Sequence, residues 1–124
     1  MINTKKEQKM ESFEIAKIAA ETISEKLGEE ITILRISKKT TLADYFVIAS
    51  ATSTTHLRAL SDEVEFRLSK AGLDPSRVEG VEGSAWILMD YDSVIIHLFL
   101  KDSRAFYGLE RLWADAEHVD FEEK

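Results

Sequence analysis

The sequence predicts a single α/β domain in which helices flank one mixed β-sheet. The chain has 124 residues, of which 44% are hydrophobic, and this is enough to form one hydrophobic core without metal or disulfide support. Its periodic segments follow the order helix, two strands, helix, weak strand, hairpin and short helix. This order, without internal repeats or linkers, is typical of one layered α/β unit.

The first half of the chain contains the better-defined part of this pattern. Apolar residues recur every three or four positions over 12–27, which predicts an amphipathic helix that stops before Gly28. The runs 31–36 and 45–51 are short and rich in β-branched or aromatic residues, so both are predicted strands. A second helical repeat begins after the Ser/Thr-rich turn 52–55 and ends at Gly72.

The second half is predicted to be mostly strand. Residues 77–85 have little periodicity and are expected to form a short strand at most, followed by a loop. The runs 86–91 and 94–100 predict an antiparallel hairpin whose turn contains Asp92 and Ser93. After it, Asp102 or Ser103 is expected to cap a short helix.

Three segments follow from this pattern. Residues 1–11 are expected to form a flexible arm, 12–115 the folded domain, and 116–124 an acidic tail that frays.

Composition excludes several classes of function. The net charge is −7, which argues against a DNA partner or a broad RNA surface, because affinity for phosphate backbones needs clustered Lys and Arg. The chain has no Cys, and its three His residues lack metal-ligand spacing, so no metal or cofactor is expected. The sequence contains no apolar run long enough for a signal peptide or a membrane span, which predicts a cytoplasmic protein without a membrane partner.

The strongest enzyme hypothesis concerns Asp90 and Asp92. Two carboxylates on one strand can bind Mg²⁺ beside a phosphate-holding Gly-Ser turn, as nucleotidyltransferases do. In this sequence Gly83-Ser84 runs directly into a strand instead of opening a helix, so the spacing fails and solvated turn residues are the alternative.

Two further polar features have structural interpretations. The turn 52–55 precedes a helix, where Ser and Thr serve as N-caps more often than as an anion site. His97 lies in an apolar strand and is expected to be a structural histidine with satisfied hydrogen bonds.

The hairpin offers apolar residues to both faces of the sheet. Alternation places Trp86, Leu88 and Asp90 on one face and Ile87, Met89 and Tyr91 on the other. Because the sequence predicts only two substantial helices, part of one face is expected to stay open as a binding surface. Each aromatic residue of this region can alternatively belong to the core.

Five blocks of the sequence resemble the ribosomal silencing factors, also called iojap-like proteins. They are "LADYFVIASATS" at 42–53, "RVEG" at 77–80, "WILMDY" at 86–91, "VIIHLFL" at 94–100 and "RAFYGLERLW" at 104–113. The blocks follow the family's order and span most of residues 12–115. The hairpin turn departs from the family pattern, which usually has Gly-Asp where this chain has Asp92-Ser93.

The resemblance implies a fold related to nucleotidyltransferases without their catalytic signature. It also implies a translational repressor, not an enzyme, that binds the large ribosomal subunit through its protein fourteen and blocks joining with the small subunit under nutrient limitation. It further implies a homodimer when free. Contact with ribosomal RNA is expected to be limited, because the chain is acidic. The expected partner-binding residues, which form the docking surface or support it, are Trp86, Leu88, Asp90, Tyr91, Arg104, Tyr107, Leu109, Arg111 and Trp113.

Overall fold

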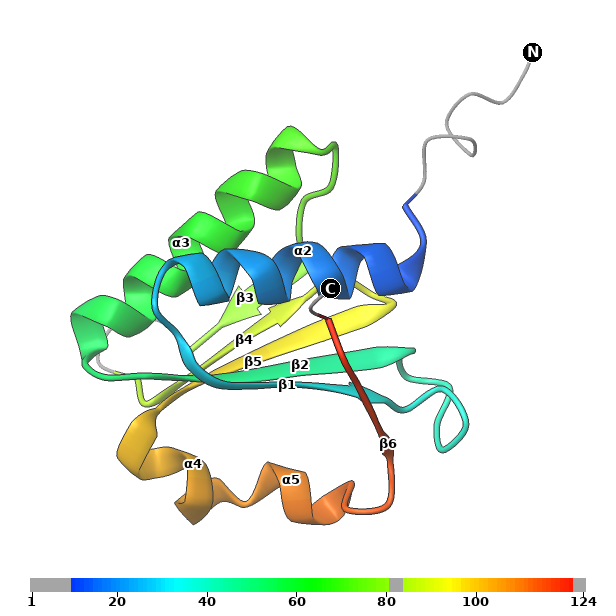
Figure 1. Cartoon of the computed structure of the whole chain (residues 1–124). Coiled ribbons are helices and arrows are strands. Elements are labelled where there is room, and N and C mark those ends of the chain that lie inside the picture. The colour runs from blue at the N-terminus through cyan, green and yellow to red at the C-terminus, as the bar shows by residue number, and fades with distance from the viewer. Residues whose placement is uncertain (1–9, 81–83, 122–124) are drawn as a thin grey trace.

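The computed structural model describes residues 10–80 and 84–121 and contains one six-stranded mixed sheet with helices on both faces (Figure 1). The helices are α2 (Ser12–Glu25), α3 (Thr54–Lys70), α4 (Lys101–Tyr107) and α5 (Leu109–Leu112). The strands are β1 (Glu29–Arg35), β2 (Tyr45–Ala51), β3 (Arg77–Glu79), β4 (Trp86–Asp90), β5 (Val94–Leu100) and β6 (Glu117–Val119). The predicted fold class is therefore confirmed. Residues 1–9 of the expected N-terminal arm lie outside the described residues.

The strand order is β3-β4-β5-β2-β1-β6, with β2 and β5 at the centre. These two strands pair in parallel, with Tyr45 opposite Val94 and Ala51 opposite Leu100, and every other pair of neighbouring strands is antiparallel. All seven residues of β2 are buried, because the strand has neighbours on both sides and is covered on both faces.

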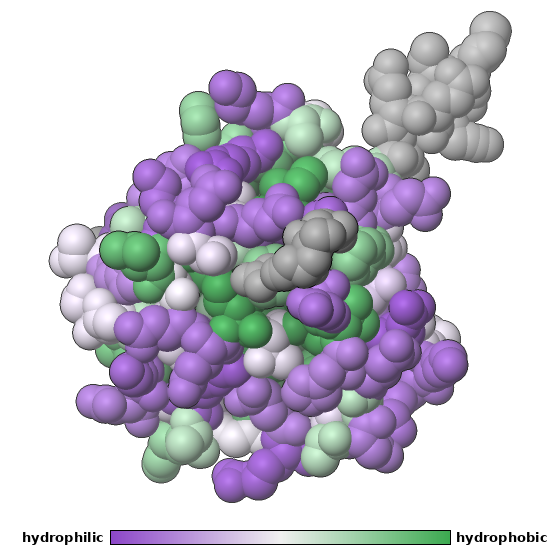
Figure 2. Space-filling model, in the orientation of Figure 1, coloured by the Kyte–Doolittle hydropathy of each residue, from purple (hydrophilic) through white to green (hydrophobic). Residues whose placement is uncertain are grey.

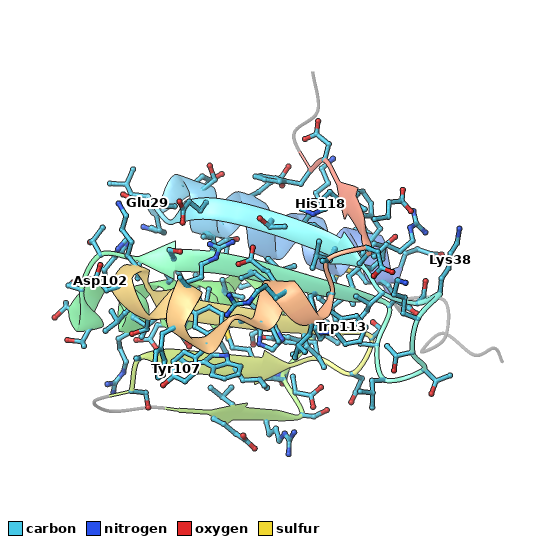
Figure 3. All side chains as sticks on the ribbon, turned by 90° about the horizontal axis from the view of Figure 1, so that it is seen from below. Glu29, Lys38, Asp102, Tyr107, Trp113 and His118 are labelled. Carbon is cyan, nitrogen blue, oxygen red and sulfur yellow. The ribbon has the colours of Figure 1, made fainter. Side chains whose placement is uncertain are left out.

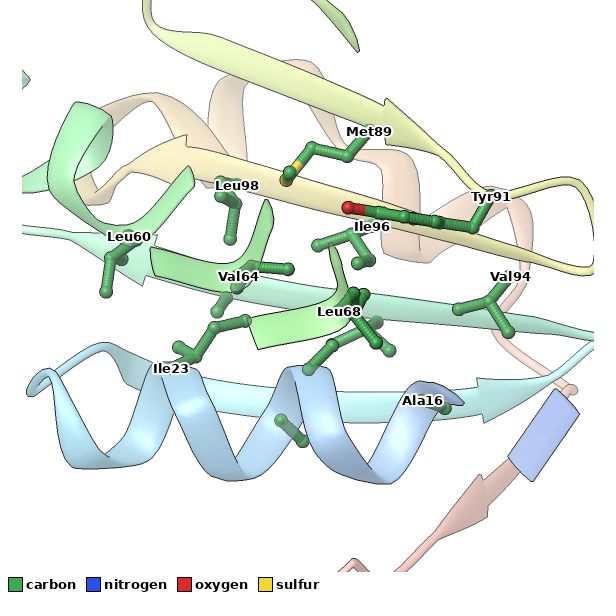
Figure 4. Packing of buried hydrophobic residues seen from close by; sticks show 14 of the residues in the cluster. Ala16, Ile23, Leu60, Val64, Leu68, Met89, Tyr91, Val94, Ile96 and Leu98 are labelled. Carbon is green, nitrogen blue, oxygen red and sulfur yellow. The ribbon is translucent and has the colours of Figure 1, made fainter. Parts of the chain in front are cut away.

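The two faces of the sheet are covered unequally. The long helices α2 and α3 lie on one face, here called the upper face, and the short helices α4 and α5 lie on the other, the lower face (Figure 1). Figure 4 shows the upper core, in which Ile23 of α2 and Leu60, Val64 and Leu68 of α3 meet the sheet. The lower core is smaller and is built from Leu34, Ile36, Ala43, Phe46, Ile48, Phe99 and Ala116.

The two long helices match their predicted positions but differ at one end. Helix α2 was expected to reach Leu27, yet it ends at Glu25 because Leu27 adopts a left-handed conformation with φ 67°. The Gly28 amide then donates to the Ile23 carbonyl at 2.8 Å. A Cβ at Gly28 would lie 2.2 Å from the Ile23 side chain, so glycine is needed here for close approach rather than for its dihedral angles.

The C-terminal segment differs most from its prediction. The expected single short helix is divided into α4 and α5 at Gly108, whose φ of 62° interrupts the helix. Neither Asp102 nor Ser103 caps α4; its N-cap is Leu100, which makes no side-chain cap bond.

The tail is also not frayed at Glu117–Val119, which form β6 against residues 33–35 of β1. Ala116 is buried in the lower core, while Val119 and Phe121 contact the upper core, so the tail wraps around the edge of the sheet. An acidic residue of the tail also finds a partner that is distant in sequence: Glu117 forms an ion pair with Arg35 of β1 at 3.1 Å.

Among the residues that the structure describes, no helix combines the length and apolar content needed to cross a membrane. The face of the molecule in Figure 2 is mostly hydrophilic, and its apolar residues form small separate areas.

Two leucines test whether the upper core provides most of the stability. Leu68 is fully buried, whereas Leu112 is 77% exposed. Leu68→Ala is expected to lower the free energy of unfolding by about 2–5 kcal/mol, because it removes buried apolar surface and leaves a cavity. Leu112→Ala, with the same chemical change, should shift it by less than about 0.5 kcal/mol. Urea unfolding measures both, and equal losses would contradict this assignment of the core.

Candidate partner-docking site

A cleft opens on the lower face between α4 and the outer strands. Its volume is about 520 Å³, and its walls are formed by Glu79, Gly80, Ser84, Ala85, Trp86, Leu88 and Tyr107. In the view of Figure 3, Tyr107 lies between α4 and β4. The cleft therefore combines aromatic and aliphatic side chains with a few polar groups, which is the usual composition of a recognition surface.

Trp86 forms the floor of this cleft. Its ring centroid lies 4.9 Å from that of Tyr107 and 4.9 Å from that of Phe99, and its indole nitrogen Nε1 donates to Nδ1 of His97 at 3.2 Å. Trp86 is only half-buried, so it belongs to the lower core and to the surface at once. The hairpin strand alternation predicted this placement, because Trp86 and Leu88 share the lower face.

Gly80 allows the outer strands to approach each other at one end of the cleft. Its φ is 82°, in the left-handed region, and a Cβ there would lie only 2.1 Å from the backbone carbonyl oxygen of Trp86. Any side chain at this position would push β4 away, so this glycine of the "RVEG" block has a geometric role.

His97 supports the floor from below. The ring is 4% exposed and lies 4.6 Å from the Phe46 ring in an edge-to-face arrangement. Because Nδ1 accepts the indole hydrogen, the proton of the neutral ring is on Nε2, which has no hydrogen-bond partner among the described residues. His97 is therefore a buried structural residue as predicted, but only Nδ1, and not Nε2, has the expected hydrogen bond. Burial lowers the pKa of His97 from 6.5 to about 4.

Two of the expected docking residues are buried and offer no surface. Tyr91 follows β4 on the upper face, where strand alternation places it with Ile87 and Met89 beneath α3 (Figure 4). Burial, with Glu65 and Asp74 nearby, raises the pKa of its hydroxyl. Arg104 is 8% exposed, and its side chain points into the molecule. Their burial favours a supporting role over direct partner contact, and their involvement in docking stays a prediction.

The remaining expected residues divide by exposure. Arg111 is exposed, while Leu109 and Trp113 are half-buried against the lower core, with the Trp113 ring 5.3 Å from that of Phe46. Figure 3 shows Tyr107 and Trp113 separated along the α4–α5 segment, so only Tyr107 reaches the cleft.

Sequence reasoning did not include every exposed apolar side chain in this site. Phe106 is 80% exposed and Leu112 is 77% exposed, although both occur in the block with the strongest aromatic pattern. Apolar periodicity over α4 would turn Phe106 toward the sheet, and only the burial of Arg104, two positions earlier on the helix, places Phe106 on the opposite side. Ser84 and Ala85 also line the cleft, but they are small residues in an aperiodic segment, and no sequence pattern indicated them.

Asp90 and Asp92 are bound within the hairpin and do not face an open phosphate site. The Asp92 amide donates to Asp90 Oδ1 at 2.8 Å, and the Ser76 hydroxyl donates to Asp92 Oδ1 at 2.8 Å. Arg77 Nε lies 3.6 Å from Asp90 Oδ2. Asp92 adopts a left-handed conformation with φ 67°, which Asp tolerates in turns. This is the position at which the family pattern usually has Gly. Gly83, the other part of that hypothesis, lies outside the described residues.

The Ser/Thr-rich turn acts as a helix cap. The Ser53 hydroxyl accepts a hydrogen bond from the His56 amide at 3.0 Å, and the His56 ring bridges the Thr52 amide and the Lys26 carbonyl. Capping was the favoured interpretation of this turn and is confirmed. Within residues 10–80 and 84–121, no group of three or more His, Asp or Glu side chains is placed to hold a metal ion.

Comparison with known proteins agrees with this description. The family model described as "Ribosomal silencing factor during starvation" matches residues 9–124. The chain belongs to this family. The ribosomal silencing factor of Bacillus subtilis is 34% identical over 113 residues, which cover 91% of this chain and 96% of the relative.

A crystal structure and a mouse relative extend the family comparison. The crystal structure of a Chromobacterium violaceum protein superposes with a TM-score of 0.82 at 33% identity, covering 93% of this chain and 95% of that one. A mouse (Mus musculus) protein named for mitochondrial assembly of the large ribosomal subunit is 35% identical over 89 residues, which cover 69% of this chain and 39% of the mouse protein. Family membership accounts for the five sequence blocks, four of which contribute residues to β4, β5, α4 and the cleft.

The buried His97 predicts a specific pH dependence of stability. Its folded pKa of about 4 lies below the ordinary value of 6.5, so as the pH falls from 6.5 toward 4 the unfolded chain takes up the proton and the folded chain does not. At 1.36 kcal/mol for each pKa unit, stability at pH 5 should be about 2 kcal/mol below its value at pH 7 from this residue alone.

Urea unfolding at pH 7 and pH 5 measures this effect. His97→Gln, which keeps an acceptor for Trp86, should lose less stability over the interval than the unchanged protein. His118→Gln, a change at an exposed histidine, should leave the loss unaltered. A His97→Gln variant with the same pH dependence as the unchanged protein would contradict the assignment.

Proposed function

We propose that this protein binds the large ribosomal subunit through protein fourteen of that subunit and prevents joining with the small subunit. The observation that carries the proposal is the family match over residues 9–124, together with an open aromatic cleft on the face that the long helices leave uncovered. The name of the mouse relative, which refers to assembly of the large ribosomal subunit, supports the choice of subunit.

The proposed mechanism is obstruction and needs no chemical step. A folded domain bound at the subunit interface excludes the volume that the other subunit requires, so the two binding events compete. Competition lowers the apparent affinity between subunits by a factor of one plus the ratio of free repressor concentration to its dissociation constant. Repression therefore follows the protein's concentration, which suits a response to nutrient limitation.

The charge distribution supports a protein partner over RNA. The net charge is −7, and Arg104 is buried in the interior. On the α4–α5 segment Lys101 pairs with Glu29 at 2.9 Å, and Arg111 is the other exposed cation of these two helices. An interface of this kind depends on aromatic and apolar contacts more than on counterion release.

Exposed apolar side chains on α4 and α5 favour pairing of two copies of the protein in the absence of ribosomes. Phe106, Tyr107 and Leu112 lie on α4 and α5 and are open to solvent. A homodimer that covers them would compete with docking, and light scattering across a concentration series would detect it.

Sedimentation with purified subunits tests the proposed function. The protein is expected to co-sediment with large subunits and not with small subunits. Tyr107→Ala should weaken this binding by about thirtyfold or more, because truncating a central interface aromatic costs about 2 kcal/mol or more and each 1.4 kcal/mol is tenfold. Tyr107 is a cleaner probe than Trp86, whose loss would also remove the bond to His97.

Phe66→Ala is the matched control, since Phe66 is a 57% exposed aromatic on α3, in the opposite layer. It should change the affinity by less than about twofold, consistent with a surface substitution outside the interface. Recovery with both subunits, with neither, or equal losses in the two variants would reject the proposal.

Salt dependence separates a protein partner from an RNA partner. Each neutralised phosphate contributes about −0.7 to −0.9 to the slope of log affinity against log salt. With few free cations beside the cleft, the measured slope should be shallower than about −5, the value that six such contacts would give. Titrations of large subunits at several salt concentrations measure it, and a steeper slope would show that RNA dominates binding.

A further inference from the structure

The α4–α5 segment, which supplies one wall of the cleft, contributes no fully buried apolar side chain; its apolar contacts are made by side chains that stay partly exposed, such as Leu109 and Tyr107. Helices of seven and four residues are too short to be stable alone, so tertiary contacts must hold them. Arg104 is the one buried residue that either helix contributes, and both helices are fully described. Phe106 and Leu112 face solvent. The residue of the segment that reaches furthest into the molecule is therefore a charged one.

Arg104 joins the two helices to each other. Its Nε donates to Glu110 Oε1 at 3.0 Å and its Nη2 donates to Glu110 Oε2 at 2.8 Å, a paired geometry that fixes both distance and orientation. The pair spans Gly108, where the backbone turns out of the helix with φ 62°. The hydrogen bond from Arg104 also lowers the pKa of Glu110, which keeps the carboxylate ionised.

The other side of the guanidinium is bound to the sheet. Nη1 donates to the hydroxyl of Ser50 on β2 at 2.8 Å and to the carbonyl of Glu30 on β1 at 2.7 Å. Nη2 lies 3.4 Å from the Thr32 hydroxyl. A buried guanidinium is stable only when its charge and its donors are satisfied, and these acceptors together with Glu110 meet that need.

The backbone of β1 is irregular at the residue that supplies the carbonyl. Glu30 has φ 49°, a left-handed conformation that costs a non-glycine residue about 1–2 kcal/mol. The register between β1 and β2 also shifts between Glu29 and Thr32, which is the pattern of a β-bulge. Bulges redirect backbone groups, and here the redirected carbonyl accepts from Arg104.

We propose that Arg104 is a positioning residue of the docking cleft, which holds α4 and α5 on the sheet through Glu110, Ser50 and the Glu30 bulge and thereby places Tyr107 against Trp86. Arg104 acts without touching the partner. The inference rests on the proposed function, because its effect on docking passes through Tyr107. If only a fraction of molecules keep Tyr107 in place, the apparent dissociation constant rises by the inverse of that fraction.

Ser50 provides the discriminating variant, because it is fully buried in β2 and no partner can reach it. Ser50→Ala removes one acceptor from Arg104 while Glu30 and Glu110 remain, and is expected to weaken binding to large subunits by about threefold to tenfold. Ser61→Ala is the matched control: Ser61 is a buried serine of α3, in the upper layer, and its loss should leave affinity unchanged.

Arg104→Met completes a double-mutant cycle. It should weaken binding by more than Ser50→Ala does, and adding Ser50→Ala to Arg104→Met should cause no further loss, because the two residues act through one bond. Glu30→Gly keeps the carbonyl and suits a left-handed angle, so it should preserve affinity, whereas Glu30→Val, which opposes that angle, should reduce it.

A second measurement separates failure of this inference from failure of the proposed function. The Gly108 amide donates to the Arg104 carbonyl at 3.1 Å, so its hydrogen exchange reports the end of α4 without any ribosome. Exchange should be faster in Ser50→Ala than in Ser61→Ala. Should the unchanged protein not bind large subunits, the proposed function fails, while the exchange result still decides whether Arg104 positions α4. Unchanged exchange in Ser50→Ala, or loss of affinity in Arg104→Met but not in Ser50→Ala, would overturn the inference.

Discussion

A sheet with two apolar faces must be covered on both, and this constraint shapes the rest of the molecule. The central strands β2 and β5 carry large apolar residues on each face, such as Ile96 above and Phe99 below. The helices α2 and α3 cover the upper face with residues at helical spacing (Figure 4). The lower face is covered by the short helices α4 and α5 and by the segment that follows them, and this cover leaves part of the face open.

The incomplete cover explains why the cleft lies where it does. Helices α4 and α5 are short and separated by Gly108, and their one fully buried side chain is an arginine, while their apolar side chains are at most half-buried. This arrangement leaves Trp86 and Leu88 open beside Tyr107, at the end of the sheet farthest from β6. The hydrogen bonds of the Arg104 guanidinium specify how α4 is oriented on the sheet, whereas an apolar side chain in its place would make contacts without a preferred direction.

The proposed obstruction requires a folded domain that fills space beside the subunit. The upper core and the pairing of β6 with β1 give the domain such a packed body. The aromatic cleft supplies contact area with little loss of side-chain entropy, because Trp and Tyr have few rotatable bonds. The polar groups at the hairpin, Asp90 and Asp92, form hydrogen bonds that shape the turn.

The sequence by itself determined the fold class, both long helices, the central strands and the alternation of the hairpin. These features depend on local periodicity: Ile87, Met89 and Tyr91 alternate with Trp86, Leu88 and Asp90 in any antiparallel strand. It also indicated the capping role of the 52–55 turn, and the order of its blocks resembled the family to which the chain belongs.

Tertiary structure alone decided which side chains of the last blocks form surface. Arg104 and Tyr107 are three residues apart on one short helix, yet one is buried and the other is 44% exposed, because the acceptors for the guanidinium lie in β1 and β2, more than fifty positions away. The tail shows the same limit, since β6 has three paired residues and no periodicity of its own and is ordered only by the edge of β1. Local patterns record which face a residue occupies, whereas exposure depends on what distant parts of the chain bring to that face.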